Sequence, residues 1–305
     1  MAPPPEVWQV RVPATSANLG PAFDSAGLAL TCHDVLEVSV ADELEVLVEG
    51  VGAGELPCDE THLVVRSFRA ACDELAWHPR NLRLVARNGI PQGRGMGSSA
   101  AAVVAGIVAA HTLCPDVGEL DRARVLRLAD EIEGHPDNVA ACVFGGLTLS
   151  WSDGHGAAAA SLAVDGGVHP LVLVPTATLS THVARGLLPS VVPHVDAAFN
   201  AGRAALLVHA LTSDPTLLLA ATEDRLHQHQ RAAAMPGTAQ LLERLRDAGH
   251  AAVVSGAGPS VLVLGAGPGV VPAVAALVGE DWHLRDLAVD HDGVRVRPAD
   301  RVVSS

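Results

Sequence analysis

A glycine-rich segment followed by two hydroxyl side chains carries the clearest chemical signal in the sequence. It reads PQGRGMGSSA from Pro91 to Ala100, with three glycines spaced two apart and then Ser98 and Ser99. Glycine lets a ligand approach the backbone closely, and serine is a preferred capping residue at the start of a helix. The unpaired amides and the dipole of a helix N-terminus attract anions. The segment therefore predicts a phosphate-binding loop, although many glycine turns before helices bind nothing.

This loop differs from two well-known nucleotide-binding loops. A Walker A loop needs a lysine before its serine, and the chain contains no lysine, since all 20 of its basic residues are arginine. The glycine spacing does not fit a dinucleotide-binding fingerprint, and no acidic residue stands at a suitable distance downstream. Backbone amides, rather than a lysine, would have to hold the phosphate.

The segment EGHPDN, from Glu133 to Asn138, is a second candidate for chemistry. Carboxylates are hard oxygen ligands of the kind that Mg²⁺ binds together with phosphate oxygens, and Asp137 or His135 could transfer a proton. A helix stop followed by an aspartate that caps the next helix would explain the glycine, the proline and the aspartate. It would not explain why four ionisable or amide side chains gather in so short a segment.

Three further polar groups are scattered along the chain. Asn18 and Asp24 lie in a loop whose Gly-Pro pair also suits an ordinary turn. Thr181 and Arg185 form a second group, and Arg231 lies far downstream. Arginine can bind a carboxylate through two parallel hydrogen bonds, although most arginines are surface residues.

The segment HQHQR and a second glycine turn complete the candidates. His227 and His229 are two residues apart, which places them on different faces of a helix and disfavours a shared metal ion. SGAGPS, at 255–260, is either a tight hairpin or a second place where backbone amides approach a ligand.

Periodicity predicts the elements that position these residues in the first half of the chain. The uncharged run from Ala100 to Ala110 predicts a helix that is buried on all sides. Further helices are expected over 62–76 and 119–133, and strands are expected over 7–13, 34–40, 44–48, 81–86 and 146–151. We expect 34–40 and 44–48 to pair with each other, 14–27 to be a loop, and 152–160 to be a low-complexity turn.

The second half of the chain, beyond a boundary expected near Asp165, mixes an antiparallel sheet with helices. A buried strand is predicted over 170–174, and strand, turn and strand are predicted over 251–265. Helices are predicted at about 179–188, 194–212, 214–229, 238–248 and 268–279, and the last part, 282–298, is rich in strands.

Composition limits the class of protein. The chain has 305 residues, of which 49% are hydrophobic and 18% charged, so we expect a soluble globular protein with two domains. A net charge of −14 disfavours a nucleic-acid partner. Five scattered cysteines without a CxxC pair predict reduced thiols in the cytoplasm. No signal-peptide pattern is evident, and the apolar run at 100–110 is shorter than the ~20 residues that span a membrane.

Taken in order, the segments resemble the motifs of the GHMP small-molecule kinases, and within that superfamily they are most similar to the homoserine kinase family. The segments are VPATSANLGPAFDSAG, PQGRGMGSSAA, EGHPDN, STHVARGLLP and SGAGPS. The central glycine loop marks the superfamily alone, whereas the combination of ATSANLGP, EGHPDN and STHVARGLLP is far more specific. The resemblance extends roughly from Val10 to Gly265.

The resemblance implies an α+β, two-domain GHMP kinase fold with the active site between the domains. Residues 1–165 would form a ribosomal protein S5 domain 2-like domain with the ATP-binding loop, and residues 166–305 a ferredoxin-like domain. The implied reaction is ATP-dependent phosphorylation of the side-chain hydroxyl of L-homoserine in threonine biosynthesis, with Mg²⁺. The alternatives are a kinase for another small alcohol or amino alcohol and a non-catalytic metabolite-binding protein. A homodimer is one option that the sequence leaves open.

The resemblance also implies roles for individual residues. The loop that wraps the phosphates of ATP would consist of Pro91, Gly93, Arg94, Gly95, Met96, Gly97, Ser98, Ser99 and Ala100. Mg²⁺ would bind Ser99 and Glu133, with Ser98 and Glu131 as alternatives. The acceptor would contact Asn18, Asp24, His135, Asp137, Asn138, Thr181, Arg185, Arg231 and Gly256, with the arginines on its carboxylate and Asp24 suited to its ammonium group. The catalytic residues would be Glu133, Asp137, Asn138 and Arg185, with Asp137 as the candidate base.

Three departures from the family pattern concern the acceptor. Ala22 replaces the usual glycine of GPGFD, Met96 replaces leucine in GLGSS, and QHQR stands where QPYR is usual. The first would change the pocket if Ala22 had a positive φ or touched the acceptor. The last puts the placement of Arg231 in doubt, so a related acceptor is a second possibility.

Overall fold

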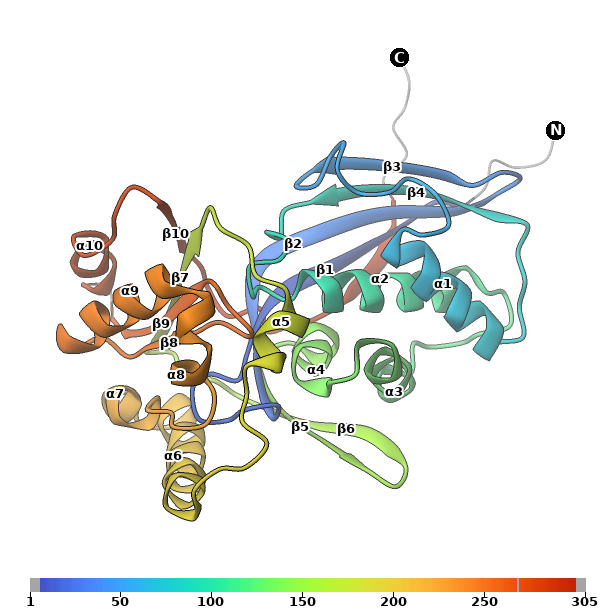
Figure 1. Cartoon of the computed structure of the whole chain (residues 1–305). Helices are drawn as coiled ribbons and strands as arrows, with labels where there is room; N and C mark the ends of the chain where they lie inside the picture. The colour runs from blue at the N-terminus through green and yellow to red at the C-terminus, as the bar shows by residue number, and fades with distance from the viewer. Residues whose placement is uncertain (1–5, 268, 300–305) are drawn as a thin grey trace.

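Two β-sheets lie next to each other in the computed structural model, which describes residues 6–267 and 269–299 (Figure 1). Within those residues the first sheet has seven strands and the second has four. The two sheets correspond to the two halves of the chain, except that the last strand returns to the first sheet.

The first sheet has the strand order β11-β1-β2-β4-β3, and β5 pairs with both β2 and β6. Its strands are β1 (Trp8–Ala17), β2 (Ala26–Ala41), β3 (Glu45–Gly50), β4 (Asn81–Asn88), β5 (Leu147–Asp153), β6 (Gly156–Leu162) and β11 (Arg295–Pro298). All pairs are antiparallel except β3 with β4, which is parallel.

Three sequence-based expectations about this sheet were wrong. The predicted pairing of 34–40 with 44–48 does not occur, because β4 lies between β2 and β3 and pairs with both. Alternation identifies the buried face of a strand but not its neighbour. β1 continues to Ala17, so the loop expected at 14–27 is confined to 18–25. The segment 152–160 is mostly a hairpin, in which β6 pairs with β5.

Four helices pack with the first sheet (Figure 1). They are α1 (Leu63–Glu74), α2 (Ser98–Leu113), α3 (Arg122–Glu133) and α4 (Pro136–Phe144). α2 packs against β1 and against the other three helices, and its residues from Val103 to His111 are all buried. The helix predicted to be buried on all sides is confirmed, and its small residues allow neighbouring backbones to approach closely.

The second sheet has the antiparallel order β10-β7-β9-β8. Its strands are β7 (Val168–Pro175), β8 (Ala252–Val254), β9 (Val261–Ala266) and β10 (Trp282–Asp286). Helices follow the first and third of these strands, so the chain runs β-α-β-β-α-β, which is the ferredoxin-like arrangement. Leu171 and Leu173 of β7 pack into a core with α9 and α10, while Val172 and Val174 belong to the larger core shared with the first domain.

The helices of the second half are short apart from two. They are α5 (Thr181–Gly186), α6 (His194–Thr212), α7 (Leu218–Ala221), α8 (Gln228–Arg231), α9 (Pro236–Asp247) and α10 (Val270–Ala275), with 3₁₀ turns η1 (Pro215–Leu217) and η2 (Ala232–Ala234). The single helix predicted at 214–229 was therefore wrong. The carboxylate of Asp224 accepts hydrogen bonds from the amides of Leu226, His227 and Gln228, which competes with helical pairing there.

The strands predicted in the last part of the chain are present, but they belong to two different sheets. The strand-rich segment 282–298 divides between β10 in the second sheet and β11, which pairs with β1 in the first. The domain boundary near Asp165 stays a prediction. Across the part of the chain that is described, no helix has the length and apolar character that crossing a membrane requires.

Close packing between α1 and α2 makes Gly106 a sensitive position. A Cβ atom there would lie 2.3 Å from the carbonyl oxygen of Val64 and 2.9 Å from the amide of Phe68. We expect Gly106→Ala to lower the free energy of unfolding by about 1–3 kcal/mol through overpacking, as measured by urea denaturation. Gly118→Ala is the control, since a Cβ atom added there would meet no other atom within 4 Å. Equal stability of the two variants would contradict this packing.

Candidate active site

A cavity lies where loops of both domains meet. The segments around it are the β1–β2 loop, the glycine loop, the α3–α4 junction, α5, α8 and the turn at 255–260. It is lined by Asn18, Gly93, Gly95, Gly97, Ser98, Ser99, Glu133, His135, Asp137, Asn138, Leu179, Thr181, Arg185, Arg231, Gly256 and Ala257. Most of the residues predicted for a site, which lie far apart in the sequence, therefore surround one cavity.

The carbonyl groups of the glycine loop are bonded to the rest of the protein. The carbonyl of Gly93 accepts from the amide of Leu179 at 3.0 Å, and that of Gly95 accepts from the Ser255 hydroxyl at 2.6 Å. The carbonyl of Met96 accepts from the amide of Thr15 at 3.1 Å. By contrast, the backbone amides of 93–100 donate to no acceptor among the described residues. A loop with bonded carbonyls and free amides is suited to an anion.

Glycine is required at two positions of this loop. Gly95 and Gly97 both have φ near +69°, which other residues rarely adopt. A Cβ atom would lie 2.1 Å from the Ser255 carbonyl oxygen at Gly95 and 1.9 Å from the Thr15 hydroxyl at Gly97. The expectation that a serine caps the following helix was wrong, because Gly97 is the N-cap residue of α2. Ser98 and Ser99 belong to the first turn of α2 instead.

The two residues predicted to bind Mg²⁺ are neighbours. The hydroxyl of Ser99 donates to Oε2 of Glu133 at 2.8 Å, which brings the start of α2 to the end of α3. Hydroxyl and carboxylate oxygens are hard donors, and Mg²⁺ commonly completes its shell with phosphate oxygens and water. Glu131 does not line the cavity. Among the described residues no group of three or more His, Cys, Asp or Glu side chains could by itself hold a metal ion.

Asp137 is held by donors from its own segment at the start of α4. Its Oδ1 accepts from the Asn138 amide at 2.7 Å and from Asn138 Nδ2 at 3.3 Å, and it lies 3.2 Å from Nδ1 of His135. The Thr15 hydroxyl donates to Oδ1 of Asn138 at 2.8 Å. The hydrogen bond with Asp137 raises the pKa of His135 above its usual value. These contacts fix the carboxylate at the lining of the cavity.

The two predicted arginines are held in different ways. Arg185 makes two parallel hydrogen bonds to Asp24, at 3.0 and 2.6 Å, and both side chains are about one-third exposed. Arg231 is 1% exposed and donates to the carbonyls of Ala184, at 3.2 Å, and Gly256, at 3.4 Å. No described carboxylate forms an ion pair with Arg231, and burial lowers the pKa of its guanidinium. Arg231 is therefore a buried cation beside a cavity.

Some predicted residues lie outside the cavity lining. Asp24 reaches the cavity through Arg185, and Pro91, Met96 and Ala100 are buried. Arg94 donates to the carbonyls of Gln92, Pro175 and Thr176, which attaches the loop to the second domain. Four residues that complete the site were not predicted individually, and all of them except Leu179 lie inside the highlighted segments: Thr15, Leu179, Ser255 and Ala257.

The departures from the family pattern have local explanations. Ala22 has no positive φ and does not line the cavity, so its methyl group leaves the pocket unchanged. In QHQR, the side chain of Gln230 donates to the Arg225 carbonyl and His229 is exposed, while Arg231 still reaches the cavity. The placement of Arg231 therefore does not depend on the residues that differ.

An apolar pocket adjoins the glycine loop on its other side. It has a volume of about 310 Å³ and shares Ser98 and Ser99 with the cavity described above. Its other lining residues are Asp34, Leu36, Leu56, Pro57, Thr61, His62, Leu63, Val64, Asn88, Gln92, Ala101 and Ala102. Burial raises the pKa of Asp34 to about 6, and its carboxylate accepts from the amides of Gly89 and Ile90. The pocket suits a flat, weakly polar part of a ligand whose anionic part would lie on the glycine loop.

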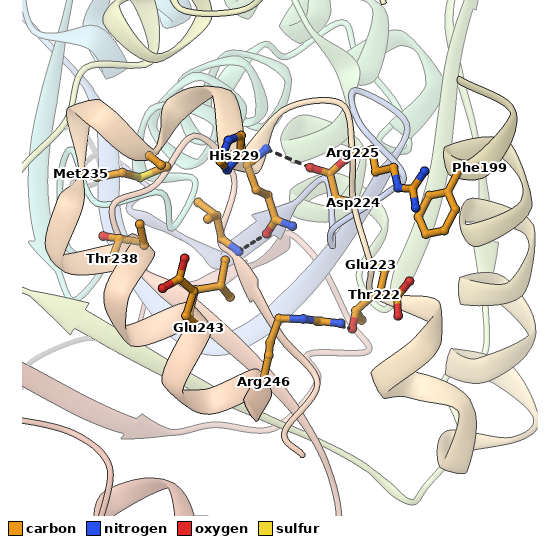
Figure 2. A pocket seen from close by; sticks show the side chains of 15 residues that line it. Phe199, Thr222, Glu223, Asp224, Arg225, His229, Met235, Thr238, Glu243 and Arg246 are labelled. Carbon is orange, nitrogen blue, oxygen red and sulfur yellow. Dashed lines mark hydrogen bonds between the residues drawn. The ribbon is translucent and has the colours of Figure 1, made fainter. Parts of the chain in front are cut away.

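A further cavity of about 310 Å³ lies inside the second domain and has a different character (Figure 2). Its arginines are already engaged: Arg225 pairs with Asp196 and stacks on Phe199, and Arg246 donates to two carbonyls and a hydroxyl. None of the predicted site residues lines it. Although it is larger than the interdomain cavity, which measures about 80 Å³, it lacks a phosphate-binding loop.

Comparisons with known proteins agree with this geometry. Two family models match, the GHMP kinases N terminal domain over residues 62–146 and the GHMP kinases C terminal over residues 197–283. The homoserine kinase of Clavibacter michiganensis subsp. michiganensis is 56% identical over 298 residues, which are 96% of this chain and 94% of that protein. The chain belongs to the homoserine kinase family. Members of this GHMP kinase group are phosphotransferases, so the chain is a kinase that uses ATP and acts on small molecules.

Other comparisons extend the same relationship. The homoserine kinase of Streptomyces coelicolor is 55% identical over 292 residues, covering 95% of this chain and 94% of that protein. The crystal structure of homoserine kinase from Cytophaga hutchinsonii matches with a TM-score of 0.84 and 25% identity, covering 96% and 98% of the two chains. Mevalonate diphosphate decarboxylase from Enterococcus faecalis, with a TM-score of 0.66 and 14% identity over 97% and 100% of the two chains, shares the fold alone. The two-domain GHMP kinase fold is thus confirmed.

The contact between His135 and Asp137 predicts a measurable titration. In the folded chain, we expect the NMR titration midpoint of His135 to lie above 6.5, and we expect Asp137→Asn to lower it. Because the folded pKa exceeds the unfolded one, this pair stabilises the fold fully below about pH 6.5 and less as pH rises through the folded pKa. A midpoint at or below 6.5 would contradict the hydrogen bond.

Proposed function

We propose that the chain transfers the γ-phosphoryl group of ATP to the side-chain hydroxyl of L-homoserine, giving O-phospho-L-homoserine. The observation that carries this proposal is the position of Arg231, a buried cation without an ionic partner among the described residues, in the same cavity as the free amides of the glycine loop. A phosphate site beside a carboxylate site is what a kinase for an amino acid requires.

ATP would bind with its triphosphate on the glycine loop and its base in the adjoining apolar pocket. The amides of 93–100 supply hydrogen-bond donors for phosphate oxygens, and the dipole of α2 adds partial positive charge at Ser98. Since Ser98 and Ser99 line both cavities, they mark the point where the base pocket meets the phosphate site. This arrangement supports nucleotide binding without any lysine.

Ser99 and Glu133 are the residues that would hold Mg²⁺. Their oxygens already lie 2.8 Å apart at the edge of the phosphate loop, and both are ligands of the type that Mg²⁺ prefers. The bound ion would neutralise charge on the phosphate oxygens. Glu133 and Arg231 both line this cavity.

The acceptor would bind with its carboxylate against the two arginines. Arg231 is fixed by backbone carbonyls, and Arg185 is fixed by Asp24, so both guanidinium groups are oriented before the acceptor arrives. Oriented groups lose little conformational freedom on binding, which favours affinity. Thr181 and Asn18 line the same cavity and supply further polar contacts. Asp24 supports the carboxylate end through Arg185 in this arrangement.

Asp137 is the residue best placed to orient or deprotonate the attacking hydroxyl. Three donor groups surround its Oδ1, while among the described residues no donor contacts Oδ2. Phosphoryl transfer depends mostly on in-line positioning and charge neutralisation, so a carboxylate that positions the hydroxyl is sufficient. Asn138 supports this geometry by linking Asp137 to Thr15.

The proposed role of Arg185 leads to a kinetic prediction. We expect Arg185→Ala to raise the KM for L-homoserine by about 100-fold, because a charge-assisted pair is lost, and to leave the KM for ATP nearly unchanged. Steady-state assays of ADP formation would measure both constants. Arg225→Ala is the matched control, since Arg225 stacks on Phe199 and lines the other cavity. An equal rise in both constants would count against the role, and turnover of another alcohol in preference to homoserine would overturn the acceptor.

The proposed Mg²⁺ ligands lead to a second kinetic prediction. We expect Glu133→Gln to shift the Mg²⁺ concentration required for half-maximal activity upward by about 10-fold or more, because the ion loses a charged ligand. Glu131→Gln, on the exposed side of the same helix and outside the cavity, is the control. The same Mg²⁺ dependence in both variants would exclude Glu133 as a ligand.

A further inference from the structure

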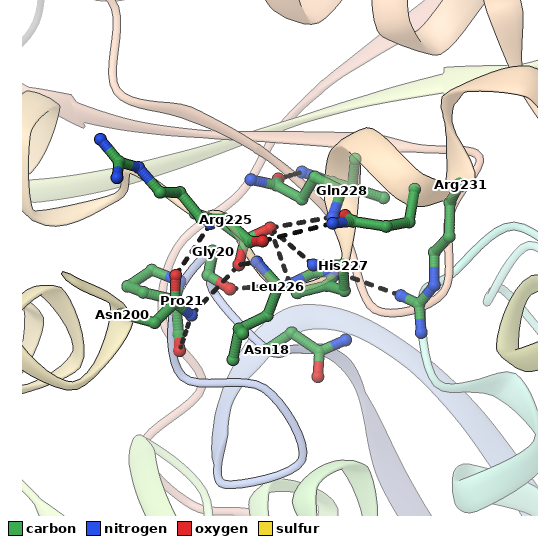
Figure 3. A network of polar contacts seen from close by, with 12 residues as sticks. Asn18, Gly20, Pro21, Asn200, Arg225, Leu226, His227, Gln228 and Arg231 are labelled. Atoms are coloured by element: carbon green, nitrogen blue, oxygen red, sulfur yellow. Dashed lines mark hydrogen bonds and ion pairs between the residues drawn. The ribbon is translucent and has the colours of Figure 1, made fainter. Parts of the chain in front are cut away.

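His227 is a buried histidine that connects the two domains beside the cavity (Figure 3). It is 1% exposed and lies in the turn just before α8. Its Nε2 is 2.7 Å from the carbonyl oxygen of Gly20, in the β1–β2 loop of the first domain. Its Nδ1 is 3.2 Å from Nη1 of Arg231. One imidazole therefore contacts both the loop at 18–25 and the buried arginine.

These two contacts define the protonation state of the ring. A carbonyl oxygen only accepts hydrogen bonds, so Nε2 carries the proton that is donated to Gly20. A guanidinium only donates, so Nδ1 must present its lone pair to Arg231. Burial is the largest cause and lowers the pKa of His227, and the charge of Arg231 lowers it further. The charge of Asp224, the hydrogen bond to Gly20 and the charge of Asp24 oppose this shift in pKa. The neutral ring with its proton on Nε2 satisfies both partners.

We propose that His227 is a positioning residue for the acceptor, because its neutral imidazole fixes the guanidinium of Arg231 against the 18–25 loop. The proposal rests on the proposed function, in which Arg231 binds the acceptor carboxylate. Within the described residues, His227 is the one side chain that hydrogen-bonds to Arg231, whose other partners are the carbonyls of Ala184 and Gly256.

The backbone amide of His227 is held by a buried carboxylate, which also lies 3.8 Å from Nε2 of the ring. Asp224, whose side chain is fully buried, accepts from the amides of His227 and Gln228 at 3.1 and 2.8 Å. It also accepts from Nδ2 of Asn200, which in turn donates to the carbonyl of Pro21 at 3.0 Å. The second domain thus contacts the 18–25 loop at two adjacent carbonyls. His227 is therefore also held by contacts that do not involve the guanidinium group of Arg231.

The aromatic ring of Phe23 lies among the same groups. Its centroid is 5.0 Å from that of His227, 5.3 Å from Cζ of Arg231 and 5.6 Å from Cζ of Arg185. Both guanidinium groups therefore pack on one ring, which belongs to the loop that His227 attaches to the second domain. A change at His227 would disturb Arg231 directly and Arg185 only through this loop.

Two substitutions separate the two hydrogen bonds of the ring. In His227→Asn, the amide oxygen can replace Nδ1 as the acceptor for Arg231, but the donor to Gly20 is lost. In His227→Gln, the longer amide can replace Nε2 as the donor to Gly20, but the acceptor for Arg231 is lost. His229→Gln is the control, because His229 is exposed and lines the cavity within the second domain (Figure 2), and its side chain forms no hydrogen bond or ion pair with the described residues.

The expected kinetic result is a split between the variants. His227→Gln should raise the KM for L-homoserine about 10-fold, with kcat and the KM for ATP within about 2-fold of the parent enzyme. His227→Asn should keep the KM for L-homoserine within about 3-fold while lowering the melting temperature. His229→Gln should match the parent enzyme. An unchanged KM in His227→Gln, or an equal rise in both His227 variants, would overturn the proposal.

A spectroscopic measurement tests the proposal without turnover. In ¹⁵N-labelled enzyme at pH 7, the His227 ring should give the chemical shifts of a neutral imidazole protonated on Nε2, and Arg231→Met should change the Nδ1 shift. A ring protonated on Nδ1, or an Nδ1 chemical shift that is the same in Arg231→Met as in the parent enzyme, would overturn the inference. If the parent enzyme failed to phosphorylate homoserine, the proposed function would fall, and this measurement would still decide whether His227 holds Arg231.

Discussion

The site depends on how the carbonyl groups of the glycine loop are bonded. Because Thr15, Leu179 and Ser255 bind the carbonyls of Met96, Gly93 and Gly95, the loop turns its amides away from the protein interior. These donors come from β1, from the segment before α5 and from the turn after β8, so both domains contribute to the shape of the loop. The phosphate site is therefore a property of the contact between the domains, and the loop sequence alone is insufficient for it.

A chain with a net charge of −14 and no lysine must build a positive site from few groups. Backbone amides supply part of that positive charge, and their contribution does not change with pH. The two arginines supply the rest in contrasting ways, since Arg185 is neutralised by Asp24 while Arg231 is buried beside carbonyls. The more costly arrangement is that of Arg231, because a buried charge without a counter-ion loses its hydration. Such a cost is typical of a residue that is kept for its ligand.

The sequence predicted the parts of this protein that depend on local pattern. The predicted phosphate loop, the buried helix behind it and EGHPDN were singled out from residue type and spacing, whereas the family resemblance supplied the roles of both arginines and the two-domain fold. The wrong predictions had two causes, a strand partner distant in the chain and a local contact between a side chain and the backbone. The neighbour of β2 is β4 rather than β3, and the predicted helix at 214–229 is interrupted because the Asp224 carboxylate takes three amides. The role of Thr15 depends on its hydrogen bonds to Met96 and Asn138, which lie far along the chain and which no spacing could reveal.

The return of the last strand to the first sheet has a consequence for synthesis. β11 pairs with Trp8–Arg11 of β1, and until it is made β1 is an edge strand with unpaired amides and carbonyls. Domains begin to fold from the N-terminus while translation continues. One edge of the first sheet therefore stays unpaired throughout the synthesis of the second sheet. Chaperone protection of the nascent chain matters most in that interval. Its length is the time needed to translate the residues that separate the first sheet's other strands from β11.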